Sequence, residues 1–238
     1  MKVAWFSCGA TSAVACKLGL KLYPELGIYY IETGSHHPDN KRFLKDCEKW
    51  FGKEIVVLKS EYKDVADVVL KKRFINSPYG AACTKILKTQ VRQKFEYEND
   101  IDTYIWGFEK GKKEENRAFR MRQRYPNFKH IFPLIDNNLD KEECLCILKR
   151  AGIDLPEMYR LGYHNNNCIG CVKGGAGYWN RIRKDFPDQF KKMAKIEREI
   201  GHSCLKKYFL DELPLDAGRN EKELEPRCSI FCGLINEE

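Results

Sequence analysis

The sequence predicts an α/β protein in which a parallel β-sheet is flanked by helices. Two observations predict this fold class. Strand-like and helix-like stretches alternate through the first half of the chain, and a polar or glycine-rich loop follows three of the strand-like stretches. Such alternation is typical of βαβ units with right-handed crossovers. The chain has 238 residues, of which 43% are hydrophobic, so it can bury the core that such a sheet requires.

The expected elements follow from apolar periodicity. Short apolar runs predict strands at 3–6, 27–31, 55–58 and 103–106, and amphipathic stretches predict helices at 12–22, 40–50, 63–72 and 85–99. Past residue 130, a helix capped by Asp140 and stopped by Gly152 precedes a polar, glycine-rich stretch, a helix over 187–201 and a loop-like tail. We therefore expect an α/β domain over 1–130 and a helical and loop region over 131–238.

Composition restricts the compartment and the class of partner. The net charge of +8 suits an anionic partner, either a nucleotide or a nucleic acid, and equally suits a solvated lysine-rich surface. No apolar run approaches the roughly 20 residues that a membrane span needs. Met1-Lys2 leads directly into a strand-like run, without the features of a secretory signal. We therefore expect a cytoplasmic protein with no membrane partner, and an oligomer is possible.

The turn after the first strand-like run has two interpretations. Its sequence, FSCGATS at 6–12, is rich in small residues. Gly9 would let the backbone approach an anion at the helix N-terminus, and the hydroxyls of Ser7, Thr11 and Ser12 could donate to phosphate oxygens. Alternatively, Thr11 or Ser12 simply caps the helix. No Gly-Lys-Ser/Thr follows, so the turn is not a Walker-type loop.

The same turn resembles the pyrophosphate-binding loop (PP-loop), Ser-Gly-Gly-x-Asp-Ser, of the ATP pyrophosphatases and sulfonucleotide reductases. The stretches YYIETGSHHPDNKRFLKDCEKWFG, CTKILK and WGFEKGKKEENR are similar to further reductase motifs in the same order, so the resemblance covers residues 1 to about 175. The chain is thereby identified as a member of the phosphoadenosine phosphosulfate (PAPS) reductase and ATP pyrophosphatase superfamily, in its iron–sulfur branch. The resemblance implies the Rossmann-like, adenine nucleotide alpha hydrolase-like fold, with residues 1–130 as the nucleotide-binding domain.

The resemblance also implies roles for individual residues around an adenine nucleotide, either ATP or PAPS. It implies that the phosphates are bound by Ser7, Gly9, Thr11 and Ser12. It implies that the adenosine side is contacted by Glu32, Thr33 and Gly34, and that Gly107 lies beneath the nucleotide. Lys88 and Arg117 would contact anionic groups of the substrate. Thr11 stands where the ATP-cleaving members have Asp, so a role for Mg²⁺ stays open. Cys8 stands where the loop has its first glycine.

Eleven cysteines in a reducing compartment favour metal or redox chemistry over disulfides. Four of them lie in helix-like stretches and are expected to be small buried apolar groups: Cys16, Cys47, Cys144 and Cys146. Cys168 and Cys171 form a Cys-x-x-Cys pair, which both zinc and iron–sulfur sites use. In the iron–sulfur branch, a cysteine at the position of Cys83 joins that pair.

Both kinds of site need about four ligands. Ala82 stands where many iron–sulfur members have a further cysteine, so one ligand of a [4Fe–4S] cluster is missing at this position. Either Cys228 or Cys232 would supply the fourth ligand, or the cluster would have three protein ligands and one open iron. The alternative is a structural zinc knot of four thiolates. Cys204 and Cys228 could also be ordinary thiols.

Three functions stay open at this point. In the first, an adenine nucleotide activates an oxygen of a nucleic acid, which sulfur from a donor protein replaces, as in tRNA thiolation and DNA phosphorothioation. In the second, PAPS is reduced through Cys232, which lies in a Cys-Gly-Leu motif like the nucleophile of the sulfonucleotide reductases. In the third, the chain is a non-catalytic, zinc-stapled nucleic-acid-binding protein. Basic residues over 110–124 favour a polyanionic partner, and His36-His37 is either a ligand pair or merely solvated.

Overall fold

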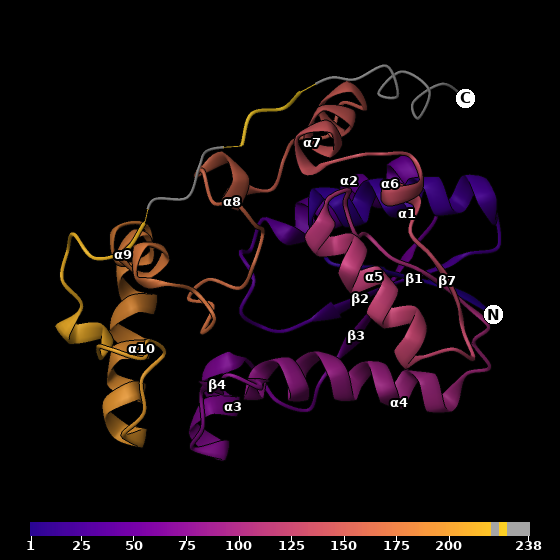
Figure 1. Cartoon of the computed structure of the whole chain (residues 1–238). Helices are drawn as coiled ribbons and strands as arrows, with labels where there is room; N and C mark the ends of the chain where they lie inside the picture. Colours follow the sequence, from indigo (N-terminus) through magenta and orange to yellow (C-terminus); the bar gives the residue numbers. More distant parts are fainter. Residues whose placement is uncertain (220–223, 228–238) are drawn as a thin grey trace.

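A computed structural model describes residues 1–219 and 224–227 of the chain (Figure 1). Cys228 and Cys232, both predicted to be functional, therefore lie outside the described residues. No helix in the described ranges is both long enough and apolar enough to cross a membrane.

A five-stranded parallel sheet forms the centre of the fold, in the order β3-β2-β1-β6-β7. Its strands are β1 (Lys2–Phe6), β2 (Gly27–Glu32), β3 (Ile55–Lys59), β6 (Thr103–Ile105) and β7 (Lys129–Ile131). The sheet confirms the predicted α/β class, and the first four of these strands match the predicted runs to within one residue at each end. The edge strand β7 was not predicted, because Lys129 and His130 interrupt any apolar run. The division predicted at residue 130 falls within β7.

The helices follow the predicted order with several additions. They are α1 (Ala10–Leu22), α2 (Asn40–Phe51), α3 (Val65–Lys72), a π-helix η1 (Thr84–Thr89), α4 (Gln90–Glu98), α5 (Lys112–Arg124), α6 (Pro133–Asp136), α7 (Lys141–Arg150), α8 (Glu157–Arg160), α9 (Ala176–Asp185), α10 (Pro187–Ile200) and a 3₁₀ turn η2 (Leu210–Glu212). Asp140 caps α7 as predicted, by accepting the N–H of Glu143 at 2.9 Å. A short antiparallel pair joins β4 (Asn76–Ser77) to β5 (Gly80–Ala81).

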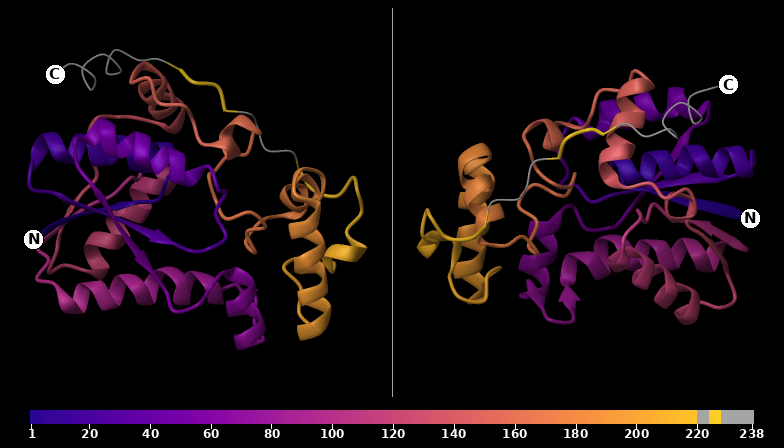
Figure 2. Two further views of the ribbon diagram at one scale, coloured as in Figure 1. Left: turned by 180° about the vertical axis from the view of Figure 1, so that it is seen from behind. Right: turned by 45° about the horizontal axis from the view of Figure 1, so that its top comes forward.

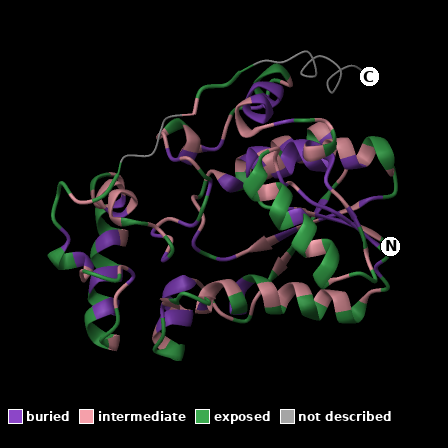
Figure 3. Cartoon of the chain, viewed as in Figure 1, coloured by how far each residue is buried: buried purple, intermediate pink, exposed green. Residues whose placement is uncertain are grey.

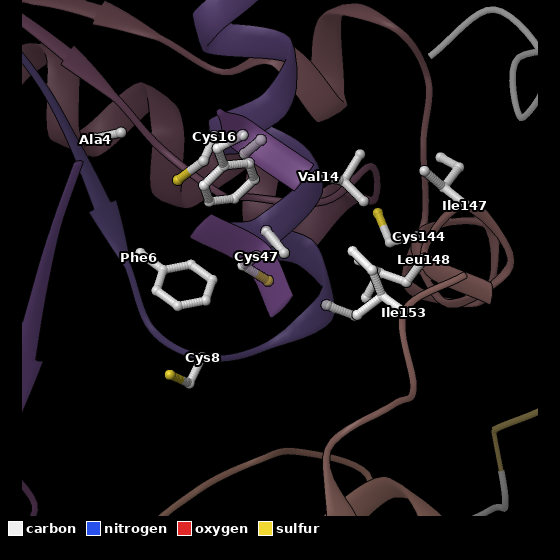
Figure 4. Close-up of a cluster of buried hydrophobic side chains, with 14 of the residues drawn as sticks. Ala4, Phe6, Cys8, Val14, Cys16, Cys47, Cys144, Ile147, Leu148 and Ile153 are labelled. Atoms are coloured by element: carbon white, nitrogen blue, oxygen red, sulfur yellow. The ribbon is translucent and has the colours of Figure 1, made fainter. Parts of the chain in front are cut away.

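Residues alternate between the two faces of the sheet. Ala4 and Phe6 of β1 point to one face, where they pack against α1, α2 and α7, and Figure 4 shows part of this first core. Val3 and Trp5 point to the opposite face, where Phe95 of α4 and Ala118 of α5 cover them. Buried thiols of Cys16, Cys47 and Cys144 lie in the first core, so these cysteines pack as small apolar groups. Cys146 is also buried there, but it is disulfide-bonded, so the prediction of a free apolar thiol is wrong for this residue.

A second core lies beside the sheet, on the side away from the N-terminus, where α9 and α10 stand (Figures 1 and 2). Apolar residues of α3, of the π-helix, of α9 and of α10 fill it, and α10 contacts α3 directly. Cys168 and Cys204 are buried in this second core, and Cys83 packs against it. The buried cysteines that the structure describes are thus divided between the first core and a second core that borders the loops of the sheet.

Helix α5 was expected to be part of a loop. Only Ala118 is buried on it, and Figure 3 shows α5 exposed along most of its length. Because almost every residue of α5 is polar, its sequence carries no apolar period that would reveal a helix. Its position against the sheet brings Arg117 to the functional site.

We expect His130 to make the folded state less stable in acid. Its ring is buried beside Trp106, whose Nε1–H donates to Nδ1 at 3.0 Å, and its Nε2–H donates to the Tyr125 carbonyl at 2.9 Å. Burial lowers the pKa of His130, and Arg122 and Arg92 lower it further. The unfolded chain therefore binds a proton near pH 6.5 that the folded state rejects, so this contribution to stability is lost as the pH falls through that range.

Urea unfolding of the wild type and of His130→Gln at pH 7.5 and pH 5 measures this effect. The free energy of unfolding should fall less between the two pH values in His130→Gln than in the wild type. His202→Gln, at an exposed histidine, should keep the wild-type pH dependence. An unchanged pH dependence in His130→Gln would show that His130 does not resist protonation.

Candidate functional site

A cleft of about 340 Å³ opens at the carboxyl ends of β1 and β6. The chain runs outward from β1 to β2 and β3 on one side and to β6 and β7 on the other, so the cleft lies at the topological switch point, where open α/β sheets bind ligands. Seven of the predicted site residues line this cleft: Ser7, Gly9, Thr11, Ser12, Lys88, Gly107 and Arg117. The structure thus brings together residues from two loops and three helical segments.

The Ser12 side chain organises the turn from within. Its Oγ accepts the N–H groups of Ser7 at 3.0 Å and Gly9 at 3.3 Å, and it donates to the Gly9 carbonyl at 2.9 Å. Ser7 Oγ also donates to it at 2.9 Å. Ser12 is buried, so its hydroxyl caps and closes the turn rather than facing a ligand. The Thr11 hydroxyl has no hydrogen-bond partner in the described part of the chain, and it faces the cleft.

Cys8 takes the conformation that a glycine would take. Its φ is +57°, in the left-handed region, which costs a residue with a side chain roughly 1 kcal/mol. Its side chain is fully buried in the first core. The Asn166 Nδ2–H group donates to the Cys8 carbonyl at 2.6 Å and to Asn40 Oδ1 at 2.9 Å, and it ties the turn to the stretch before the cysteine pair. Burial and this hydrogen bond offset the strained backbone.

Gly107 and Gly34 sit where a side chain would meet neighbouring backbone. A Cβ on Gly107 would lie 2.8 Å from Ser12 Cα and 3.0 Å from Ser12 N, so β6 approaches the first turn of α1 only because this residue is glycine. Gly34 has a φ of +69°, and a Cβ there would lie 2.0 Å from the Lys63 carbonyl oxygen. Both predicted glycines therefore have a structural reason to be glycine.

Cations and two carboxyl groups, those of Glu109 and Glu114, share the cleft. Lys88 forms no ion pair with any residue that the structure describes, so its charge is available to a ligand. Arg117 lies over the Phe108 ring at 4.2 Å and donates to Glu114 Oε2 at 3.1 Å. Glu109 also lines the cleft, and its Oε2 is buried with no hydrogen-bond partner among the described residues. Burial raises the pKa of Glu109, which favours its protonated form beside an anionic ligand.

Glu32, Thr33 and Gly34 do not line the cleft. Thr33 Oγ1 instead lies 3.2 Å from Cys168 Sγ, and the Gly34 N–H donates to Glu32 Oε1 at 2.8 Å. His36 links this group to the cleft, because it lines the cleft while its Nδ1 lies 3.3 Å from Glu32 Oε1. A contact of these three residues with adenosine stays a prediction.

His36 is the buried centre of a charged group. The interpretation that the His36-His37 pair is merely solvated is wrong for His36, whose side chain is 5% exposed. Although burial disfavours the charged imidazole, hydrogen bonds to Cys168 and Glu32 raise the pKa of His36. Burial opposes the thiolate of Cys168, but His36 and Lys88 lower its pKa to about 7. A thiolate at neutral pH is the form that binds a metal.

Cys83, Cys168 and Cys171 lie close enough to influence one another. Burial and the charges of Cys168 and Cys171 raise the pKa of Cys83 to about 11, while Lys173 and Lys88 lower it. The turn at Cys168 and Cys171 is closed by Tyr178, whose hydroxyl accepts the Cys171 N–H and donates to the Cys168 carbonyl, both at 2.9 Å. The donor set of thiols beside lysines fits a thiophilic metal group. Within the described ranges, no three His, Cys, Asp or Glu side chains already stand as the ligands of one metal ion.

Several cleft residues were not predicted. Tyr159 accepts the Ala10 N–H at 3.4 Å through its hydroxyl, which places a polar group against the first turn of α1. Tyr159 and Asn166 come from the second half of the chain, and no local pattern marks them. Glu109, in contrast, lies in the WGFEKG loop after β6, and its position after a strand was a usable signal.

This chain has a parallel sheet, and a turn of small residues lies at the point where the strand order reverses. Both features are typical of α/β proteins that bind anionic ligands at the carboxyl ends of their strands. The family model described as the phosphoadenosine phosphosulfate reductase domain matches residues 2–175, and the chain belongs to this family. This match confirms the predicted superfamily, while its iron–sulfur branch stays a prediction.

Two individual proteins are also similar to this chain. The crystal structure of PAPS reductase from Candida auris, a phosphate complex, has a TM-score of 0.51 and 14% identity, and the match covers 68% of this chain and 78% of that chain. At this identity the likeness shows the fold alone. An uncharacterized protein of Methanocaldococcus jannaschii is 25% identical in an alignment of 216 residues, and the match covers 85% of this chain. The chain spans only 44% of that protein's length.

Proposed function

We propose that the protein is an enzyme that binds an adenine nucleotide in the cleft and carries out sulfur chemistry with the help of a thiolate-held [4Fe–4S] cluster. One observation carries this proposal: Lys88 lines the cleft and also acts electrostatically on Cys83, Cys168 and Cys171. A phosphate group bound at Lys88 is therefore a neighbour of the cysteines. The family match over residues 2–175 supports the nucleotide.

The residues of the cleft have separate tasks. The first-turn N–H groups of α1 and the hydroxyls of Ser7 and Thr11 bind phosphate oxygens, and Lys88 and Arg117 neutralise their charge. Cys83, Cys168 and Cys171 hold the cluster, which when bound supplies a site for sulfur.

The proposed acceptor is a nucleic acid. A groove of about 620 Å³ runs between the π-helix and α5, and Arg117 lines both this groove and the cleft. Arg92, Arg120 and Arg124 add positive charge to the groove, and Tyr79 is fully exposed at its edge. Arginines beside an exposed aromatic ring suit the backbone and bases of a single strand. In the proposed reaction the acceptor oxygen attacks ATP and takes up AMP with release of pyrophosphate. Sulfide then forms a bond to the acceptor atom, and the oxygen leaves as part of AMP, so that no oxidant or reductant is consumed.

A second candidate, reduction of PAPS, is favoured by the description of the matching family. That reaction would use Cys232 as its nucleophile. The match ends at residue 175, so it includes the cleft, Cys83, Cys168 and Cys171 but not Cys232. For this reason the first candidate, whose cleft residues and three thiolates named above all lie within the match, is preferred.

Two assays on anaerobically purified protein distinguish these functions. The first contains ATP, Mg²⁺, a sulfide donor and single-stranded RNA or DNA, and it measures pyrophosphate and sulfur in the nucleic acid. The second contains PAPS and reduced thioredoxin, and it measures sulfite. Product in the first assay alone supports the proposal, and sulfite alone supports the reductase. No product in either assay, with nucleic-acid binding that weakens steeply with salt, would support the non-catalytic binding protein.

A further inference from the structure

One asparagine holds together three cysteine-bearing segments of the chain. The Asn76 Nδ2–H group donates to the Val172 carbonyl at 2.6 Å and to the Cys204 carbonyl at 3.1 Å. Val172 directly follows Cys171, so the residues after the Cys-x-x-Cys pair lie beside the backbone of Cys204.

The strand that carries Asn76 also fixes Cys83. Asn76 of β4 pairs with Ala81 of β5, and the Ala82 N–H donates to the Ile75 carbonyl at 3.2 Å. Cys83 follows at once and begins the π-helix. Three segments that are distant in sequence, at 81–83, 171–172 and 204, therefore meet at one side chain.

Cys204 itself is held firmly at this point. It is 7% exposed and belongs to the second core together with Cys168. The buried carboxylate of Glu197 accepts the N–H groups of Cys204 at 2.5 Å and Leu210 at 2.6 Å, which fixes the loop after α10. Besides burial and Glu197, the nearby charges of Cys171 and Cys83 act on the Cys204 thiol.

We propose that Cys204 is the fourth thiolate of the metal site, with Cys83, Cys168 and Cys171. The inference rests on the metal site of the proposed function. It makes Cys204 the fourth ligand, a role for which Cys228 or Cys232 was expected from the sequence. It also explains how the site is completed although Ala82 precedes Cys83. Lys88 and Lys173 lie near the thiols of Cys83 and Cys171, and the Cys204 thiol lies beside Glu197. Four cysteine sulfurs are the soft donors that a [4Fe–4S] cluster takes, with one thiolate on each iron.

The test compares metal content in four variants of the full chain, Cys204→Ser, Cys47→Ser, Cys228→Ser and Cys232→Ser. Each is reconstituted without oxygen with iron and sulfide, and iron, sulfide, zinc and the absorption near 400 nm are measured. We expect the wild type and the last three variants to hold about four irons per chain. Cys204→Ser should lose at least one iron per chain together with most of the absorption. Cys47 is a matched control because it is equally buried, in the first core.

A folding defect must be separated from a lost ligand. Cys204→Ala serves as a second variant, and circular dichroism and nucleotide affinity report whether each variant is folded. Folded Cys204 variants that keep four irons would overturn this inference and leave the proposed function intact. The same conclusion would follow if Cys228→Ser or Cys232→Ser lost iron while the Cys204 variants kept it. A wild type that binds neither iron nor zinc would overturn both. Zinc bound through Cys204 would support this inference while it contradicts the proposed cluster.

Discussion

Replacing Gly107 by alanine should weaken nucleotide binding by roughly tenfold or more, which corresponds to about 1.4 kcal/mol. A methyl group there would lie 2.8 Å from Ser12 Cα and 3.0 Å from Ser12 N, and backbone cannot rotate away as a side chain can. The first turn of α1 must move away from β6, and with it the N–H groups and the hydroxyls that bind phosphate. Overpacking of this kind also costs about 1–3 kcal/mol of stability. Isothermal titration with ATP and with PAPS measures the affinity, and thermal unfolding measures the stability.

Gly175→Ala is the matched control for Gly107→Ala. Gly175 has a φ of −78°, and a Cβ there would meet no atom within 4 Å, so this variant adds the same methyl group without a clash. It should bind nucleotide like the wild type. If Gly107→Ala also binds nucleotide normally, the close approach of β6 to α1 does not shape the phosphate site.

Replacing Lys88 by glutamine should reduce nucleotide affinity by about 10- to 100-fold, since a hydrogen bond to a charged group contributes roughly 1.5–3 kcal/mol. Lys88 extends from the π-helix into the cleft and has no competing ion pair among the described residues. It also lowers the pKa of Cys168, after the larger effect of His36, so its loss should reduce the fraction of that thiolate. Titration with nucleotide measures the first effect, and the rate of thiol alkylation at pH 7 in metal-free protein measures the second.

Lys85→Gln provides the comparison for Lys88→Gln. Lys85 lies three residues earlier on the same π-helix and lines the outer grooves rather than the cleft. Both variants remove one positive charge, so a general effect of net charge should weaken both equally. Equal affinities in the two variants would contradict a specific contact between Lys88 and phosphate.

The sheet and its functional edge could be predicted from sequence because buried parallel strands are short apolar runs. Because parallel strands have their carboxyl ends at the same edge of the sheet, the loops after β1, β2 and β6 were expected to lie together at that edge. In the structure, the turn at 7–12, His36 and Gly107 all line the cleft at this edge. Strand β7 and helix α5 could not be found in this way, because polar residues interrupt any apolar run in both. Their positions depend on packing against the sheet rather than on their own periodicity.

The contacts between distant segments were beyond local patterns. The residues at 84–89 form a π-helix, although one regular helix was expected over 85–99, and Lys88 of this π-helix lines the cleft. Cys204 was treated as an ordinary thiol, because nothing near it in the sequence shows that Asn76 brings it beside Val172. The types of residue at the site could therefore be predicted from the sequence. The contacts that these residues make with distant segments could be identified only from the fold.

If nucleotide and cluster bind as proposed, we expect the hydrogen bonds of Asn166 to make the two halves of the site thermodynamically dependent on each other. Its amide joins the carbonyl of Cys8, in the phosphate turn, to the stretch that leads into Cys168. Neither loop can shift without moving the other or breaking a buried bond. Occupancy of one half therefore changes the free energy of occupying the other, and the coupling is reciprocal: whatever factor nucleotide contributes to metal retention, metal contributes equally to nucleotide affinity.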